Sequence, residues 1–334
     1  MEVGNTEYIN NVRNSSVQRT LREYSKAFDS VHKALYSAPH LPMAYYELAL
    51  LYTDVCQPKN VSRLIAIAKI KCFNHSMYWK NVLLGYESEN KLNFEKAKEY
   101  YKAAKSCKDT TDCGFVATFN LGCMSVFKAD YASAEGYYLE AAEIHQLNTE
   151  WSNWNHHLCL CYNNIGMCYS AQFKESSAIR MFTIAIKSGP NLLRSYQERI
   201  TSYMRYRNHE LALEDCHTAF KLTTHKPTLS SLCLCMASSQ TKTSDKVNDL
   251  LKAIELDPRN DIAYDSLTDL LITFDNTGAS HSIINYFIHW CKGDGPCLAV
   301  LYSKLHQIEK QTEKKVYYGR MMLAMHNGLM DRIS

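Results

Sequence analysis

The segment YNNIGMCYSAQFKESSAIRMFTIAIKSGP, residues 162–190, indicates how the chain folds. Ala178, Phe182 and Ala185 follow the spacing of one helix face, and the polar stretch SAQFKES separates them from a helix that contains Gly166. Small residues let two helices approach closely, while aromatic side chains fill the space around them. The segment therefore predicts a pair of helices that needs neighbours to cover its apolar faces.

The same pattern returns at intervals of 34 residues. Ala185 is followed by Ala219 and Ala253, and Tyr162 is followed by Tyr196. With small insertions, the pattern also occurs upstream in LLGYESENKLNFEKAKEYYKAA and FNLGCMSVFKADYASAEGYYLEAA. Self-similarity at a fixed period is typical of solenoids, in which stacked units bury a continuous core.

These residues resemble the tetratricopeptide repeat, a 34-residue unit of two helices with small and aromatic residues at fixed positions. The resemblance covers most of the chain and implies an all-α fold. The implied fold is a right-handed α-solenoid of about eight helix-turn-helix repeats, which we expect to be closed by capping helices at residues 295–334. The repeats, expected to form a single domain over residues 1–334, span residues 8–41, 42–75, 78–111, 115–148, 159–192, 193–226, 227–260 and 261–294.

Charge and cysteine content narrow the class of protein. The chain has 37 basic and 34 acidic residues, which favours neither nucleic acid nor an anionic membrane as the main partner. The opening residues MEVGNTEYINNVRNSS lack a signal-peptide core, and no stretch reaches the roughly eighteen apolar residues of a membrane span. Thirteen cysteines without an export signal indicate reduced thiols. We therefore expect an intracellular, cytoplasmic protein.

The sequence has no motif that indicates catalysis or a cofactor. It contains no P-loop and no dinucleotide-binding fingerprint. Zinc-ligand residue types occur at His156, His157, Cys159, Cys161, Cys107 and Cys113. Cys159 and Cys161 point to different faces of one helix, however, and no paired CxxC element is present, so buried thiols are the better interpretation. We predict a non-enzymatic protein without catalytic residues, metal or cofactor.

In tetratricopeptide solenoids the first helix of each unit faces the concave surface, so the resemblance implies a binding groove there. A clamp for the carboxylate of a chaperone C-terminus is disfavoured, because Phe119 and Cys123 do not match its pattern and Glu198 would repel a carboxylate. Some peptide-binding members instead carry asparagine two residues before the glycine of successive units. Asn120 and Asn164 stand at that position, either as an amide ladder or by coincidence.

The sequence thus predicts a scaffold that binds an extended or amphipathic helical segment of a partner protein. The expected groove contacts are Tyr46, Trp79, Tyr86, Phe119, Asn120, Asn163, Asn164, Gln197 and Arg205. The alternative is a structural subunit whose groove is filled permanently inside a ciliary, transport or cell-cycle complex. An insertion at residues 149–158 carries Trp151 and Trp154, which either pack on the convex face or anchor a partner.

Overall fold

The structure is a computed structural model that contains helices and their connecting turns. It describes residues 3–74, 76–107, 114–147, 155–189 and 192–273, together with residues 303, 304 and 306. These residues form fifteen α-helices and no β-strand, so the predicted all-α fold class is confirmed.

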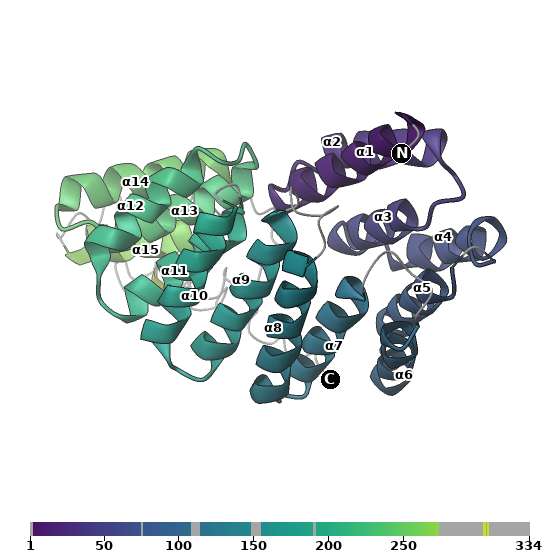
Figure 1. Ribbon diagram of the computed structural model, residues 1–334. Coiled ribbons are helices and arrows are strands. Elements are labelled where there is room, and N and C mark those ends of the chain that lie inside the picture. The colour runs from purple at the N-terminus through teal and green to yellow at the C-terminus, as the bar shows by residue number, and fades with distance from the viewer. Residues whose placement is uncertain are drawn as a thin grey trace. The chain divides into compact units, whose positions relative to one another are not determined.

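Along the chain the helices follow one another in pairs that match the sequence repeat (Figure 1). The pairs are α1 (Val3–Thr20) with α2 (Tyr24–Ser37), α3 (Met43–Asp54) with α4 (Pro58–Lys71), α5 (Met77–Asn90) with α6 (Phe94–Lys105), α7 (Phe115–Phe127) with α8 (Tyr131–Leu147), α9 (Asn155–Ala171) with α10 (Glu175–Ser188), α11 (Leu193–Arg205) with α12 (His209–Phe220), and α13 (Lys226–Ser239) with α14 (Thr243–Leu256), followed by α15 (Asp261–Thr273). The break between α9 and α10 falls where the SAQFKES stretch predicts it.

The two helices of a pair are joined by a short turn of constant geometry. In the first six pairs the turn contains one non-glycine residue with positive φ: Arg22, Cys56, Leu92, Ala129, Phe173 or Arg207. After α7, the N–H of Ala129 donates to the carbonyl of Val126 at 2.8 Å and the N–H of Asp130 donates to that of Ser125 at 3.0 Å. This is the Schellman arrangement, which satisfies the last carbonyls of a helix. The turn after α13 differs, because Gln240 has φ −68°.

A glycine against an aromatic ring sets the close approach of the helices in three pairs. A Cβ atom added at Gly85, Gly122 or Gly166 would lie 2.6 Å from a ring carbon of Tyr101, Tyr138 or Phe182, respectively. The three rings are almost completely buried. Each glycine precedes its ring by the same number of residues, so the predicted role of small residues in helix pairing is confirmed.

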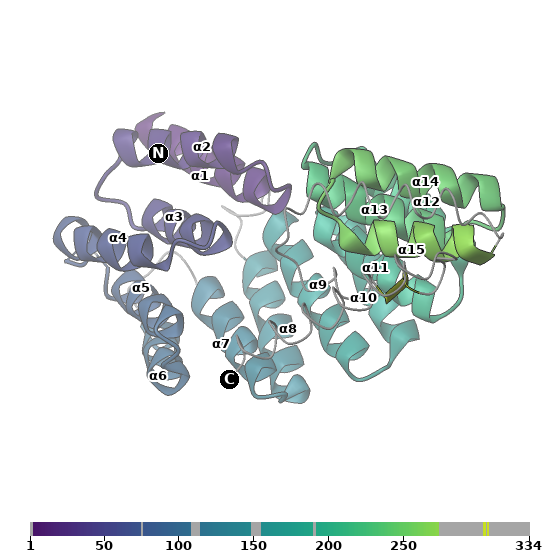
Figure 2. The same ribbon diagram turned by 180° about the vertical axis from the view of Figure 1, so that it is seen from behind.

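The chain divides into two compact units. Unit 1 comprises Met1–Leu211 and Lys221–Thr223, and unit 2 comprises Ala212–Phe220 and Thr224–Ser334. Within unit 1, successive helices pack against each other, and first helices also contact first helices, as α1 does α3 and α9 does α11 (Figures 1 and 2). In unit 2, α13, α14 and α15 enclose a small apolar core that contains Leu250 and Leu267. The predicted single domain stays a prediction.

Some predicted features lie outside the described residues. These are the second half of the last expected repeat, most of the expected cap at residues 295–334, and Trp151 and Trp154 of the insertion. Among the helices that the structure does describe, none has both the length and the hydropathy required to cross a bilayer.

Candidate functional site

A groove with a volume of about 320 Å³ lies within unit 1. All its lining residues come from α1, α3, α5, α7, α9 and α11, which are the first helices of six successive pairs. The second helices contribute none of the lining. This is the arrangement that the tetratricopeptide resemblance implies, with the first helix of each unit facing the binding surface.

Six of the nine predicted contact residues line this groove, and three do not. The six are Tyr46, Trp79, Tyr86, Phe119, Asn120 and Asn164. The other three are Asn163, Gln197 and Arg205.

Three aromatic rings from two neighbouring helices form one wall of the groove. Tyr46 of α3 lies 6.0 Å from Trp79 and 5.5 Å from Tyr86, measured between ring centroids, and both partners belong to α5. Trp79 and Tyr86 are seven residues apart, which places them on one helix face. Trp79 and Tyr86 are 4% and 6% exposed and Tyr46 is half-buried, so the three rings form a largely apolar wall.

Asn120 is held in place by this wall. Its Nδ2 donates to the hydroxyl of Tyr46 at 3.0 Å, and its Oδ1 lies 3.3 Å from the same hydroxyl. Asn120 is only 6% exposed, whereas Asn164 is half-buried. Burial raises the pKa of Tyr46 well above its usual value, so this phenol stays neutral. Of the two asparagines, Asn164 is therefore the more accessible to a ligand.

Two of the three remaining residues connect helices. Asn163 is fully buried, and its Oδ1 accepts a hydrogen bond from Ser195 Oγ at 3.0 Å, which joins α9 to α11. Arg205 is exposed and forms an ion pair with Glu175 at 3.2 Å. Gln197 lies half-buried on α11, away from the groove lining. These contacts depend on how successive repeats pack against each other, and sequence periodicity alone does not predict that packing.

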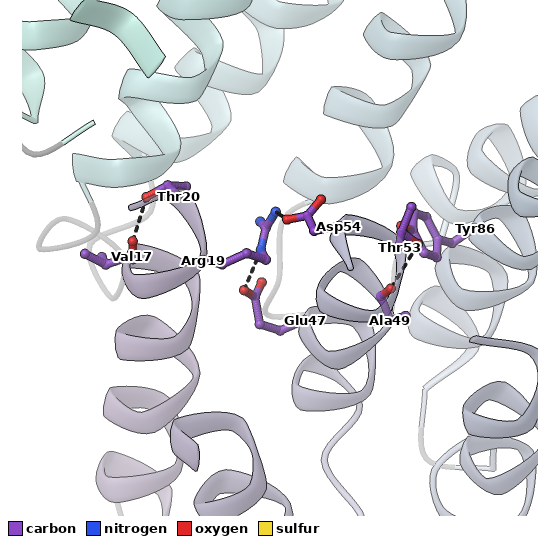
Figure 3. A network of polar contacts seen from close by, with 8 residues as sticks. All are labelled: Val17, Arg19, Thr20, Glu47, Ala49, Thr53, Asp54 and Tyr86. Atoms are coloured by element: carbon purple, nitrogen blue, oxygen red, sulfur yellow. Dashed lines mark hydrogen bonds and ion pairs between the residues drawn. The ribbon is translucent and has the colours of Figure 1, made fainter. Parts of the chain in front are cut away.

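The groove also contains charged residues that the sequence analysis did not select. Arg19 Nε lies 2.8 Å from Glu47 Oε1, and its Nη1 lies 3.3 Å from Asp54 Oδ2 (Figure 3). Burial lowers the pKa of Arg19, but Glu47 and Asp54 outweigh it and hold the pKa above its usual value. Burial raises the pKa of Glu47, and Arg19 partly opposes that shift. The cation of Arg19 is thus already neutralised within the protein.

Glu89 is a second acidic residue of the groove lining. Its Oε2 accepts a hydrogen bond from the Tyr101 hydroxyl at 2.9 Å. Burial is the main cause that raises the pKa of Glu89. Arg194 lines the groove on α11, where its Nε lies 3.6 Å from Glu198. All the charged lining residues lie on first helices, which the repeat pattern identifies. Charged residues are common on helix surfaces, however, so the sequence alone does not single these out.

The described residues contain no group of three or more metal-ligating side chains. Cys159 and Cys161 are buried in α9, and burial raises the pKa of the Cys159 thiol to about 12. A thiol with such a pKa is a poor nucleophile at neutral pH.

No protein-family model matches the sequence, and no curated protein is significantly similar to it. Solved structures do match. One is a tetratricopeptide repeat protein from Parabacteroides merdae, with a TM-score of 0.51 and 15% identity over 75% of this chain and 93% of that one. The fold is that of tetratricopeptide repeat proteins. The tetratricopeptide interpretation of the sequence is confirmed at the level of fold.

Human IFIT1 has a similar fold. Its dimer with m7Gppp-AAAA matches with a TM-score of 0.55 and 15% identity, covering 91% of this chain and 68% of IFIT1. A monomeric IFIT1 mutant with Gppp-AAAA matches with a TM-score of 0.56 and 15% identity, covering 90% and 67%. At 15% sequence identity, these matches are evidence for the fold alone. Because IFIT1 was solved with these ligands, the prediction that nucleic acid is not a partner is not confirmed.

Proposed function

We propose that this protein is a non-enzymatic scaffold that binds a segment of a partner protein in the groove of unit 1. The observation that carries the proposal is the composition of the groove, in which first helices alone present an aromatic wall beside two side-chain amides. Aromatic anchors supply apolar contact area, and amides both donate to and accept from a peptide backbone. An extended or amphipathic segment offers the matching groups.

The charges in the groove favour a protein segment over a phosphate-rich ligand. Recognition of phosphate groups needs arginine or lysine side chains that are available for charge-assisted hydrogen bonds. Arg19 is engaged by two carboxylates and Arg194 lies 3.6 Å from Glu198, while Glu89 adds negative charge to the same groove. An oligonucleotide would meet these carboxylates, whereas a neutral or basic peptide would not be repelled.

Asn164 provides the cleanest test of the amide contribution. Replacing Asn120 by alanine would also release Tyr46, whereas Asn164 is half-buried and its Oδ1 accepts only a long hydrogen bond, 3.5 Å from Asn163 Nδ2. Each hydrogen bond to a peptide backbone contributes roughly 0.5–1.5 kcal/mol net. Asn164→Ala should therefore weaken peptide binding about two- to tenfold, with the Asn120→Ala, Asn164→Ala double variant weaker still.

A library of random peptides displayed on phage tests the site itself. The full chain is used for selection, and the selected peptides are then titrated by fluorescence polarisation against wild type and Asn164→Trp. The indole ring should fill the groove and abolish binding. Asn248→Trp is the matched control, because Asn248 is exposed on α14 in unit 2. Circular dichroism checks that both variants are folded.

Peptides that bind wild type and Asn248→Trp equally, but not folded Asn164→Trp, would support the proposal. Failure to select any peptide, or equal binding to all three proteins, would contradict it. A capped or triphosphorylated oligoadenylate is titrated in parallel. Binding of that oligonucleotide that is lost in Asn164→Trp would assign the groove to nucleic acid instead.

A further inference from the structure

Glu89 holds a carboxylate in the groove lining without a cation beside it. Its Oε2 accepts from the Tyr101 hydroxyl, and among the described residues no lysine, arginine or histidine forms an ion pair with it. The other acidic residue of the lining, Glu47, is matched by Arg19 at 2.8 Å. Glu89 is half-buried, and a carboxylate partly removed from water without a cation beside it carries a cost that an incoming cation would relieve.

The surroundings of Glu89 are those that a cationic side chain prefers. Glu89 and Tyr86 are three residues apart on α5, so their side chains share a face of that helix. Burial is the main cause of the raised pKa of both Tyr46 and Tyr86, and the Glu89 carboxylate adds to the shift in each. Glu89, Tyr46 and Tyr86 all line the groove, and the faces of aromatic rings attract lysine and arginine.

We propose that the partner segment places a lysine or arginine side chain against Glu89, with Tyr46 and Tyr86 around its aliphatic stem and charged head. This inference rests on the proposed function, because it describes how the same groove selects its peptide. Arg194 lines the groove from α11, whereas Glu89 is on α5. Arg194 is matched by Glu198, whereas Glu89 has no ion pair among the described residues, so Glu89 would fix where along the groove the basic residue of the segment lies.

Short bead-bound peptides test this inference. They have random sequences except for one central residue, which is lysine, arginine, norleucine or glutamate. The labelled full chain is applied as wild type, Glu89→Gln or Glu87→Gln. Glutamine keeps the size of Glu89 and an oxygen that accepts from Tyr101. Glu87 is the matched control, because it lies on the same helix but outside the groove lining, where it pairs with Lys91.

Wild type and Glu87→Gln should bind the lysine and arginine peptides at least about tenfold more strongly than the norleucine peptides, since charge-assisted contacts are about twice as strong as neutral ones. Glu89→Gln should retain binding but lose this preference. Equal binding of lysine and norleucine peptides by wild type, or an unchanged preference in Glu89→Gln, would overturn the inference.

Applying labelled Asn164→Trp to the same peptides separates failure of this inference from failure of the proposed function. If wild type binds peptides without a basic preference and Asn164→Trp does not bind them, the groove binds peptides but Glu89 does not select them. If Asn164→Trp binds as wild type does, the groove itself is the wrong site, and both proposals fail. Raising the salt concentration should reduce the basic preference only slightly, because a contact inside the groove is poorly screened.

Discussion

At the scale of single residues, Arg19 illustrates how the groove depends on buried charges. Its guanidinium connects α1 to Glu47 and Asp54 of α3, and both Arg19 and Glu47 line the groove (Figure 3). A buried ion pair is not strongly stabilising compared with an apolar pair of the same shape. Removing one partner is a different matter, because the other charge is then left buried.

Arg19→Ala should therefore lower the free energy of unfolding by about 3–5 kcal/mol, since Glu47 loses its cation in a buried site. Urea denaturation measures the change. Arg180→Ala is the control, because Arg180 is exposed on α10 and its loss should stay within about 0.5 kcal/mol. Similar midpoints for the two variants would show that the Arg19 network does not hold α1 to α3.

His145 gives the stability of unit 1 a pH dependence. It is 3% exposed, and its ring centroid lies 5.7 Å from that of His157. Burial lowers the pKa of His145, so the folded state disfavours the protonated ring. The unfolded chain protonates near pH 6.5, and stability is therefore lost as the pH falls below that value, by up to about 1.4 kcal/mol per pH unit.

The His145→Gln variant should lose part of this dependence. Urea denaturation of wild type and variant at a series of pH values between neutral and mildly acidic measures it. We expect the two stability curves to converge as the pH falls below the pKa of a free histidine. Parallel curves over the whole range would rule out His145 as the titrating group.

At the scale of helices and turns, the repeated turn has an identifiable strain. Ala129 has φ 56°, a left-handed conformation that disfavours any side chain with a Cβ atom. Ala129 is exposed, so its methyl group makes little compensating contact. Glycine adopts this conformation without the penalty.

Ala129→Gly should accordingly raise the free energy of unfolding by about 0.5–1 kcal/mol. The same substitution at exposed Ala103, inside α6, should lower it by about 0.5–1 kcal/mol, because glycine is unfavourable within a helix. Thermal denaturation of both variants measures the two changes. Destabilisation at both positions would contradict the assigned turn geometry.

Glycines offer a second matched pair. A Cβ at Gly166 would lie 2.6 Å from Cε1 of Phe182, whereas one at Gly136, inside α8, would have no neighbour within 4 Å. Gly166→Ala should cost about 1–3 kcal/mol by overpacking. Gly136→Ala should instead stabilise by about 0.5–1 kcal/mol, because alanine favours a helix. Equal effects in urea denaturation would show that Gly166 does not set the helix spacing.

At the scale of the whole molecule, the sequence predicts the paired helices and six of the residues that line the groove. Periodicity within a helix and the 34-residue repeat suffice to place Tyr46, Trp79 and Phe119 on first helices that face one side. Contacts between successive repeats are harder to predict from the sequence. Tyr46 and Asn120 are 74 residues apart, and their hydrogen bond depends on how successive pairs stack. Neither the period within a helix nor the 34-residue repeat encodes that stacking. The ion pair between Arg19 and Glu47 could not be predicted for the same reason.

Photo-crosslinking tests most directly the central claim that the groove of unit 1 binds a partner segment. A peptide selected on the full chain carries a benzophenone residue beside its lysine, and the crosslinked residues are identified by mass spectrometry. The account predicts crosslinks to α3, α5 and α7, near Tyr46, Trp79 and Phe119, that disappear in folded Asn164→Trp. Crosslinks confined to the second helices of the pairs, or to unit 2, would contradict it.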